Sequence, residues 1–369
     1  MADSRVALVI DGREWYGWTG VQVVRSIEQI AGTFDLGLTE EWPGAGTVRP
    51  IGPGAGCTVT IDGETVITGW VDDVAPSYDA ASHDLVVRGR DRTGDLVDCA
   101  VLPPYEFKAL KLDEIVRRLA APYGISVRAD VDVGAPFARY ALQPGETVFE
   151  AIERGCRQRA ILPVSDGKGG ILLTRAGTGA AAAPIVLGSN VIACQATFSY
   201  AQRFSEYHAI GQQEGADSQA DASVAAAPAA VAKDAAVRRH RPTVVMAEAQ
   251  GDGSTLQERA EWARAMAAAQ SRRAAYIAQD WRPGGALWQP NTMVPVTDPW
   301  ANLDGTPLLI VKTTMTLSDA GTLTQIDVAP KEAYALKAEQ DAADKAKARA
   351  GSGAGGGSKD DPFSLWDAH

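Results

Sequence analysis

Three aspartates, Asp91, Asp95 and Asp98, lie close together in the segment GRDRTGDLVDC. Spacings of four and three residues would place their carboxylates on one face of a helix, as a metal site requires. The alternative is a strand end followed by a short capped helix whose acids are solvated. We favour this alternative because no histidine or further acid completes a set of ligands.

None of the four histidines, His83, His208, His240 and His369, lies in a metal-binding or nucleophile motif. His240 belongs to RRHR, which we interpret as a solvated loop or a contact for acids of a partner. GSGAGGGS and DGKGG lack the context of a phosphate-binding loop. The sequence therefore predicts no catalytic residue, no cofactor and no metal site, and we do not expect an enzyme.

The composition indicates a globular chain rich in strands. The 369 residues suffice for two or three domains, and 37 glycines with 20 prolines favour many short strands joined by turns. A net charge of −11 disfavours tight binding to phosphate backbones but would suit the wall of a passage for nucleic acid. No apolar run approaches the roughly 18 residues of a membrane-spanning helix, so we expect no membrane insertion and synthesis in a cytoplasm. Four widely spaced cysteines, Cys57, Cys99, Cys156 and Cys194, predict buried thiols in a reducing compartment.

Residues 1–103 predict a first β-barrel-like domain. In TFDLGLT, Phe34, Leu36 and Leu38 alternate with Asp, Gly and Thr, as in a half-buried strand. Asp62-Gly63 lies between β-branched arms and predicts a tight hairpin turn.

Residues 104–180 predict a small α+β domain. LKLDEIVRRLAAPYG places its large apolar side chains on one helical stripe. Thr147 and Glu150 form a capping box before a second helix, and Asp166-Gly167 predicts a closing hairpin.

Residues 181–335 predict a second β-barrel-like domain. It contains a long helix at 255–280, with a capping Ser or Thr and no proline before Pro283. The stretch 215–237 is low in complexity and poor in large apolar groups, which predicts a mobile loop. The fold class is thus mainly β, with two barrel-like β domains flanking an α+β module.

Residues 336–369 predict a flexible tail with a docking peptide at its end. The tether GSGAGGGS precedes three large apolar side chains, Phe363, Leu365 and Trp366. The chain's own core is not expected to hold them, and we hypothesise that they bind another protein.

Residues 281–300 hold three of the nine tryptophans, in WRPGGALWQPNTMVPVTDPW. Trp281 and Trp288 either fill the core between helix and sheet or contribute to an assembly surface. Trp300 lies in the turn-like TDPWANLDG, which favours a surface or an interface. All three remain interface candidates.

Over about residues 3 to 335, the chain resembles the baseplate hub proteins of Mu-like contractile-tailed phages, also called the tail protein P family. The resemblance rests on the order of five segments: FDLGLTEEWPG, GRDRTGDLVDC, QPGETVFEAIERGCRQRAILPVSDGKGGILLTR, RFSEYHAIGQQ and WRPGGALWQPNTMVPVTDP.

This resemblance implies a structural protein of the virion tail, made in the host cytoplasm. Such hubs form a homotrimer whose barrel-like domains make a pseudo-six-fold ring between the six-fold tail tube and the three-fold spike. Related hubs occur in type VI secretion spikes. The implied partners are the spike, a tube or tube-initiator protein and other baseplate proteins, with DNA only passing through the lumen.

Two other functions remain open. One is a tail-associated peptidoglycan hydrolase that would use Asp91, Asp95 and Asp98. The other is a carbohydrate-binding β protein that would stack sugar rings on Trp288 and Trp300.

Overall fold

The computed structural model describes residues 5–39, 51–79, 83–211, 229–247, 253–318 and 321–334. The N-terminal β segment consists of β1 (Val6–Ile10), β2 (Arg13–Trp15), β3 (Gly20–Ser26), β4 (Thr33–Thr39), β5 (Gly56–Ile61), β6 (Glu64–Tyr78) and β7 (His83–Asp91). The turn between β5 and β6 has φ angles of 51° at Asp62 and 81° at Gly63. Positive φ at both central positions is the property of a primed hairpin turn, so the predicted hairpin is confirmed.

A second β segment follows in the C-terminal half. It consists of β13 (Gly179–Ala180), β14 (Ile185–Val186), β15 (Val191–Phe198), β19 (Arg272–Gln279), β20 (Thr292–Asp298), β21 (Leu303–Ser318) and β22 (Gly321–Ala329), with the short helices η2 (Pro283–Gly285), η3 (Pro299–Ala301) and η4 (Lys331–Tyr334).

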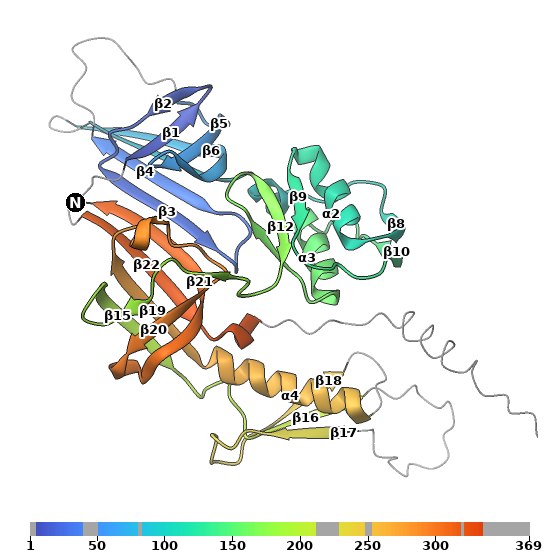
Figure 1. Cartoon of the computed structure of the whole chain (residues 1–369). Coiled ribbons are helices and arrows are strands. Elements are labelled where there is room, and N and C mark those ends of the chain that lie inside the picture. The colour runs from blue at the N-terminus through green and yellow to red at the C-terminus, as the bar shows by residue number, and fades with distance from the viewer. Residues whose placement is uncertain are drawn as a thin grey trace, which may run out of the picture.

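The two β segments form one continuous 14-stranded sheet. Its main path is β15-β19-β22-β21-β3-β4-β7-β6-β5-β1-β2. The segments join where β3 pairs antiparallel with β21, from Val21 opposite Leu317 to Ser26 opposite Lys312 (Figure 1). Each segment curls around an apolar core of its own, as barrel-like domains do, but the described strands close neither barrel.

A tryptophan from the second segment completes the core of the first. Trp281 follows β19 but is fully buried in the first core, together with Met315. Its indole Nε1 donates hydrogen bonds to the carbonyl oxygens of Thr316, at 3.1 Å, and Leu323, at 2.9 Å. Trp288 is buried in the second core. A shared core therefore fixes the segments to one another in addition to the backbone pairing.

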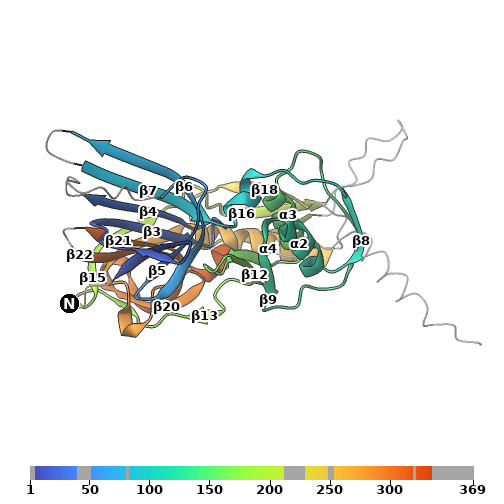
Figure 2. The ribbon, with the colours of Figure 1, turned by 90° about the horizontal axis from the view of Figure 1, so that it is seen from above.

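The predicted α+β module lies between the two segments. It contains α1 (Gly94–Asp98), β8 (Glu106–Leu110), α2 (Leu112–Ala120), η1 (Ala121–Tyr123), β9 (Ser126–Ala129), β10 (Phe137–Ala141), α3 (Val148–Gln158), β11 (Leu162–Ser165) and β12 (Gly170–Thr174). Figure 2 shows the module to one side of the main sheet.

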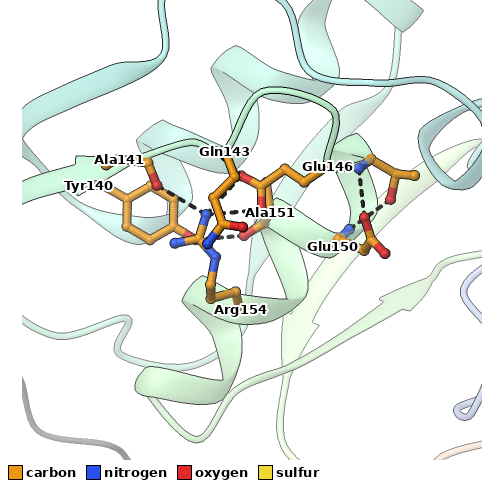
Figure 3. Close-up of polar contacts among 8 residues, drawn as sticks. Tyr140, Ala141, Gln143, Glu146, Glu150, Ala151 and Arg154 are labelled. Atoms are coloured by element: carbon orange, nitrogen blue, oxygen red, sulfur yellow. Dashed lines mark hydrogen bonds and ion pairs between the residues drawn. The ribbon is translucent and has the colours of Figure 1, made fainter.

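The start of α3 is fixed by the capping box that the sequence predicts. Thr147 Oγ1 accepts from the N–H of Glu150 at 3.1 Å, and Glu150 Oε2 accepts from the N–H of Thr147 at 2.7 Å. Figure 3 also shows Arg154, which donates to Glu146 at 2.8 Å and lies 4.8 Å from the centre of the Tyr140 ring. These contacts bind α3 to β10 and to the loop before the helix.

The described residues between 199 and 271, inserted between β15 and β19, form a separate α/β unit. Its strands lie in the order β17 (Ala229–Lys233), β16 (Glu206–Gly211) and β18 (Pro242–Ala247), and α4 (Gly253–Gln270) packs on them. The predicted mobile loop 215–237 is therefore wrong for β17, where Ala230 and Ala232 are small enough to pack beneath α4. Residues 215–228 of that loop lie outside the described residues.

The predicted helix at 255–280 is wrong beyond Gln270. Ser271 Oγ donates to the carbonyl oxygen of Ala268 at 2.6 Å where α4 ends, and β19 follows. In β19, Ala274, Tyr276 and Ala278 are buried at every second position, which is the period of a strand. Pairing of β19 with β15 and β22 overrides the helical propensity of its alanines.

The predicted tail 336–369, with Phe363, Leu365 and Trp366, lies outside the described residues. Across the described ranges, no helix has the length and apolar character needed to cross a membrane.

The capping box allows a direct test of the module. Thr147→Ala removes the acceptor for the Glu150 N–H, and we expect the free energy of unfolding to fall by about 1 kcal/mol. Thr147→Ser retains the hydroxyl and should lose far less. Urea unfolding followed by circular dichroism measures both variants, and equal stabilities would contradict the capping role.

Candidate functional site at the open sheet edges

The two β segments are internal repeats of one topology. Along the sheet the first repeat runs β3-β4-β7-β6 and the second runs β15-β19-β22-β21, so the last two strands are in reversed chain order in both. The long strands β6 and β21 also correspond, because each pairs with a preceding strand, β5 or β20, along its first part. Each has a register shift near its middle, between Val71 and Asp73 in β6 and between Ile310 and Lys312 in β21.

The correspondence extends to single residues. Crossing the first repeat, the residues opposite one another are Val74, Val87, Leu36 and Val21. Crossing the second repeat, they are Thr313, Ile326, Tyr276 and Cys194. Val74 and Thr313 occupy the same place after the register shift of their strands. Cys194 of β15 therefore corresponds to Val21 of β3.

The two repeats differ in whether another strand pairs with the second part of their long strand, β6 or β21. In β21, Lys312–Leu317 pairs with β3, whereas β5 covers β6 only as far as Trp70. No described strand forms a ladder with the corresponding stretch of β6, residues 73–78, on that side. β15 is the first strand of the path and pairs with β19 along one side. From Ile192 onward, no described strand pairs with its other side.

Both open edges expose apolar side chains. Nearly every residue of β15 is exposed, including Ile192 and Phe198, and Phe198 is 53% exposed. Tyr200 follows this strand and is also exposed. On the β6 edge, Tyr78 is 72% exposed, and Pro76 is of the type found on edge strands because it has no N–H to leave unpaired. Unpaired ladders flanked by apolar side chains favour pairing with another chain.

A polar cluster braces the sheet beside β15. Arg273 Nη2 donates to Glu28 Oε1 at 3.0 Å, and the Tyr334 hydroxyl donates to the same oxygen at 2.5 Å. Burial, reinforced by Glu28, raises the pKa of Tyr334. The three residues line a cavity of about 260 Å³, and their contacts join β19 and η4 to the segment after β3. The cluster therefore fixes the start of β19 against the segment after β3.

The three aspartates of the sequence analysis do not converge on one site. Asp95 accepts a hydrogen bond from Trp70 Nε1 at 3.0 Å, and Asp98 forms an ion pair with Arg90 at 2.7 Å. The part of the chain that the structure describes has no group of three or more His, Cys, Asp or Glu able to hold a metal ion. A strand end followed by a short helix is confirmed, but the helix has no side-chain cap and Asp91 is buried rather than solvated.

Asp91 instead connects the first repeat to the module. Its Oδ2 accepts from Ser165 Oγ of β11 at 2.7 Å, and its Oδ1 accepts from the N–H of Thr93 at 2.9 Å. Burial raises the pKa of Asp91 although these hydrogen bonds oppose the shift. Asp91 and Arg25 of β3 line one small cavity. Burial lowers the pKa of Arg25.

The tryptophan candidates separate into two kinds. Trp281 and Trp288 are buried inside the protomer, so they are core residues, and we correct their assignment as interface candidates. Trp300 is 90% exposed at the turn between β20 and β21. Asp298 fixes that turn, since it accepts from the N–H of Trp300 at 3.0 Å and from the Tyr276 hydroxyl at 3.0 Å. Trp300 remains a candidate contact.

Two of the four histidines, His208 and His240, lie in the inserted α/β unit. His208 lies on β16, with its Nε2 3.0 Å from Glu206 Oε2. His240 and its neighbour Arg239 are exposed in the loop before β18. No local sequence pattern indicates the open edges, because pairing between distant segments determines which strand edges remain uncovered.

Comparison with known proteins identifies relatives along nearly the whole chain. Residues 5–91 match the family "Mu phage baseplate assembly protein GpP-like, N-terminal", residues 93–175 match "Baseplate hub protein gp44-like, second domain", and residues 253–337 match "Mu phage baseplate assembly protein GpP, fourth domain". The baseplate hub protein gp44 of Escherichia phage Mu is 34% identical over 347 residues, which are 92% of this chain and 91% of that protein.

Solved structures agree with this relationship. The 43 kDa tail protein of prophage MuSo2 from Shewanella oneidensis has a TM-score of 0.80 at 35% identity, covering 90% of this chain and 100% of that one. A type VI secretion component of E. coli has a TM-score of 0.55 at 10% identity, covering 88% of this chain and 76% of that one, which shows a shared fold alone.

The buried Asp91 gives a prediction for pH dependence. A carboxyl whose pKa is raised by folding binds its proton more tightly in the folded state, so its contribution to stability falls as pH rises through that pKa. Asp91→Asn removes this titration and keeps an acceptor for Thr93. Urea unfolding between about pH 4 and pH 7 should therefore show the variant gaining stability relative to the unmodified chain as pH rises. A constant difference would contradict the raised pKa.

Proposed function

The chain belongs to the family of Mu phage baseplate hub proteins, and from this premise we propose that it forms a homotrimeric ring in the tail baseplate of a virion. The observation that carries the proposal is a pair of open strand edges in one sheet, one on β15 at the end of its path and one on the second part of β6, which β5 leaves uncovered. Pairing of β15 of one copy with β6 of the next is a head-to-tail contact between different surfaces. Such contacts close into a ring when the rotation from one copy to the next is a whole-number fraction of a full turn.

The internal repeat supplies the register of this contact. Within the chain, Lys312–Leu317 of β21 pairs with β3. The corresponding partners across the junction are residues 73–78 of β6 and residues 194–199, which comprise the second part of β15 and the residue after it. In the intrachain ladder Leu317 lies opposite Val21, so Tyr78 of one copy lies opposite Cys194 of the next. The junction between copies thus reproduces the junction between repeats.

Three copies with two repeats each make a ring of six similar units. A ring of this kind matches a six-fold tube on one side and a three-fold spike on the other, which is the role that we propose. The spike, a tube or tube-initiator protein and other baseplate proteins are the proposed partners. Trp300 is a proposed contact for one of them, because a large exposed aromatic side chain on a fixed turn is a typical interface anchor.

The face of the sheet turned away from the cores is suited to line the lumen. It carries charges of both signs in pairs: Arg88 lies 2.6 Å from Asp35, and Lys312 lies opposite Asp327. Paired charges offer DNA no continuous basic track to which phosphates could bind. We propose that DNA passes along this face without being retained.

A structural role accounts for the described residues better than the two alternatives. A peptidoglycan hydrolase would need converging carboxylates, whereas Asp91, Asp95 and Asp98 each bind a different structural partner. A sugar-binding platform would need an accessible Trp288, which is buried. We therefore propose that the chain acts by assembly and not by catalysis.

The proposed register is tested by Tyr78→Cys. Residues facing one another across antiparallel strands have Cα atoms about 4.5–5.5 Å apart, within the range of a disulfide. Mild oxidation should therefore join the new thiol to the exposed Cys194 of the next copy and give covalent trimers on non-reducing gels.

Asp73→Cys is the matched control. Its position is five residues along the same edge, about 17 Å from Cys194 in the proposed register, so no disulfide should form. A monomeric mass in solution together with no cross-link from Tyr78→Cys would contradict the ring.

The C-terminal peptide with Phe363, Leu365 and Trp366 is proposed to bind the spike or another baseplate protein. Deleting residues 351–369 should weaken capture of that partner about 100-fold or more, since tethering raises local concentration to the millimolar range. The trimer should persist by analytical ultracentrifugation. Undiminished capture in a pull-down with the co-expressed spike protein would remove the peptide from the proposal.

A further inference from the structure

One face of the three-stranded sheet in the inserted unit has no described element packed on it. α4 covers the other face, where Tyr207, Ala209 and Ala232 are buried. On the uncovered face, His208 lies opposite Val231 of β17 and Val244 of β18, and Val244 is 58% exposed. Figure 1 shows α4 on the side turned toward the main sheet, so the uncovered face is turned away from the rest of the chain.

The inserted unit and the module leave the main sheet at the same end. β7 ends at Asp91, beside the start of β4, and the module follows. β15 ends at Phe198, opposite Arg272, and the inserted unit follows. The ladders between these strands place both exits at one end of the sheet.

In the proposed ring, β15 of one copy lies beside β6 and β7 of the next. The inserted unit of one copy therefore lies beside the module of its neighbour. The uncovered face is turned away from the unit's own chain (Figure 1), so it is open to a neighbouring copy.

We propose that the uncovered face of the β16–β18 sheet binds the α+β module of an adjacent copy of this chain. This inference rests on the proposed ring. It adds to the β6–β15 junction a second contact, at the end of the sheet where the module and the inserted unit leave it. The module provides exposed apolar side chains for such a contact on the segment from α1 to β8: Leu102 is 75% exposed, and Val97 and Tyr105 are exposed near it. Burying apolar groups of both copies together explains why each leaves them in water as a single chain.

A photo-cross-linking residue at position 244 tests the contact in the full-length trimer. Irradiation should join it to residues 93–175, and trimers mixed from isotopically heavy and light chains should show that the joined peptides come from different copies. The same cross-linker at Tyr16, equally exposed but on the first repeat, is the control and should not reach the module.

The outcomes separate this inference from the ring itself. If Tyr78→Cys forms its cross-link with Cys194 but position 244 reaches no module residue of another copy, the inference is wrong and the ring stands. If neither cross-link forms, the ring is wrong and the inference fails with it.

A stability measurement gives an independent answer. Val244→Glu changes an exposed side chain and should leave each protomer folded, while the trimer dissociates at about tenfold higher protein concentration or more. Tyr16→Glu should leave the dissociation midpoint unchanged. An unaltered midpoint for Val244→Glu, with a normal circular dichroism spectrum, would overturn the contact.

Discussion

Backbone pairing between β3 and β21 determines the arrangement of almost every other element. It brings together positions 285 residues apart, since Ser26 Oγ donates to the carbonyl oxygen of Val311. A slip of one residue would turn every side chain of β3 to the opposite face, so the alternation of buried and polar residues fixes the register. With that ladder set, the two repeats have one relative position, and the open edges at β15 and β6 have a defined geometry.

The second parts of β21 and β6 occupy equivalent places in the two repeats, but they differ in their pairing. The second half of β21 is paired with β3 of the same chain, whereas the corresponding half of β6 has no described strand on that side. The covalent connection makes the first pairing independent of concentration, whereas the proposed pairing of β6 with β15 involves another copy. The register shifts near Val71 and Ile310 lie where each long strand passes from its own hairpin to the shared ladder. Bulges at such points increase strand bending and twist.

Local chemistry made part of the fold predictable from the sequence. Asp62-Gly63 and the Thr147–Glu150 capping box depend on neighbours within a few residues, and both are present. The errors arose where distant contacts decide. Arg272–Gln279 contains helix-forming alanines but pairs on both sides as β19, and the alanine-rich β17 packs beneath α4. The open edges could not be predicted, because pairing between segments far apart in the sequence decides which strand edges are covered, and the strand order alone reveals it.

The position of Trp281 has a consequence for biosynthesis. The first core needs this side chain and Met315, which are translated long after the strands that surround them. While the ribosome is still making the middle of the chain, the N-terminal strands have an incomplete interior with apolar groups open to water. Domains of many proteins fold one after another as they leave the ribosome. In this chain, the core of the first repeat is complete only after Trp281 and Met315 have been translated. Prematurely ended chains would thus be candidates for chaperone binding or degradation, which limits the pool of subunits to those translated nearly to completion.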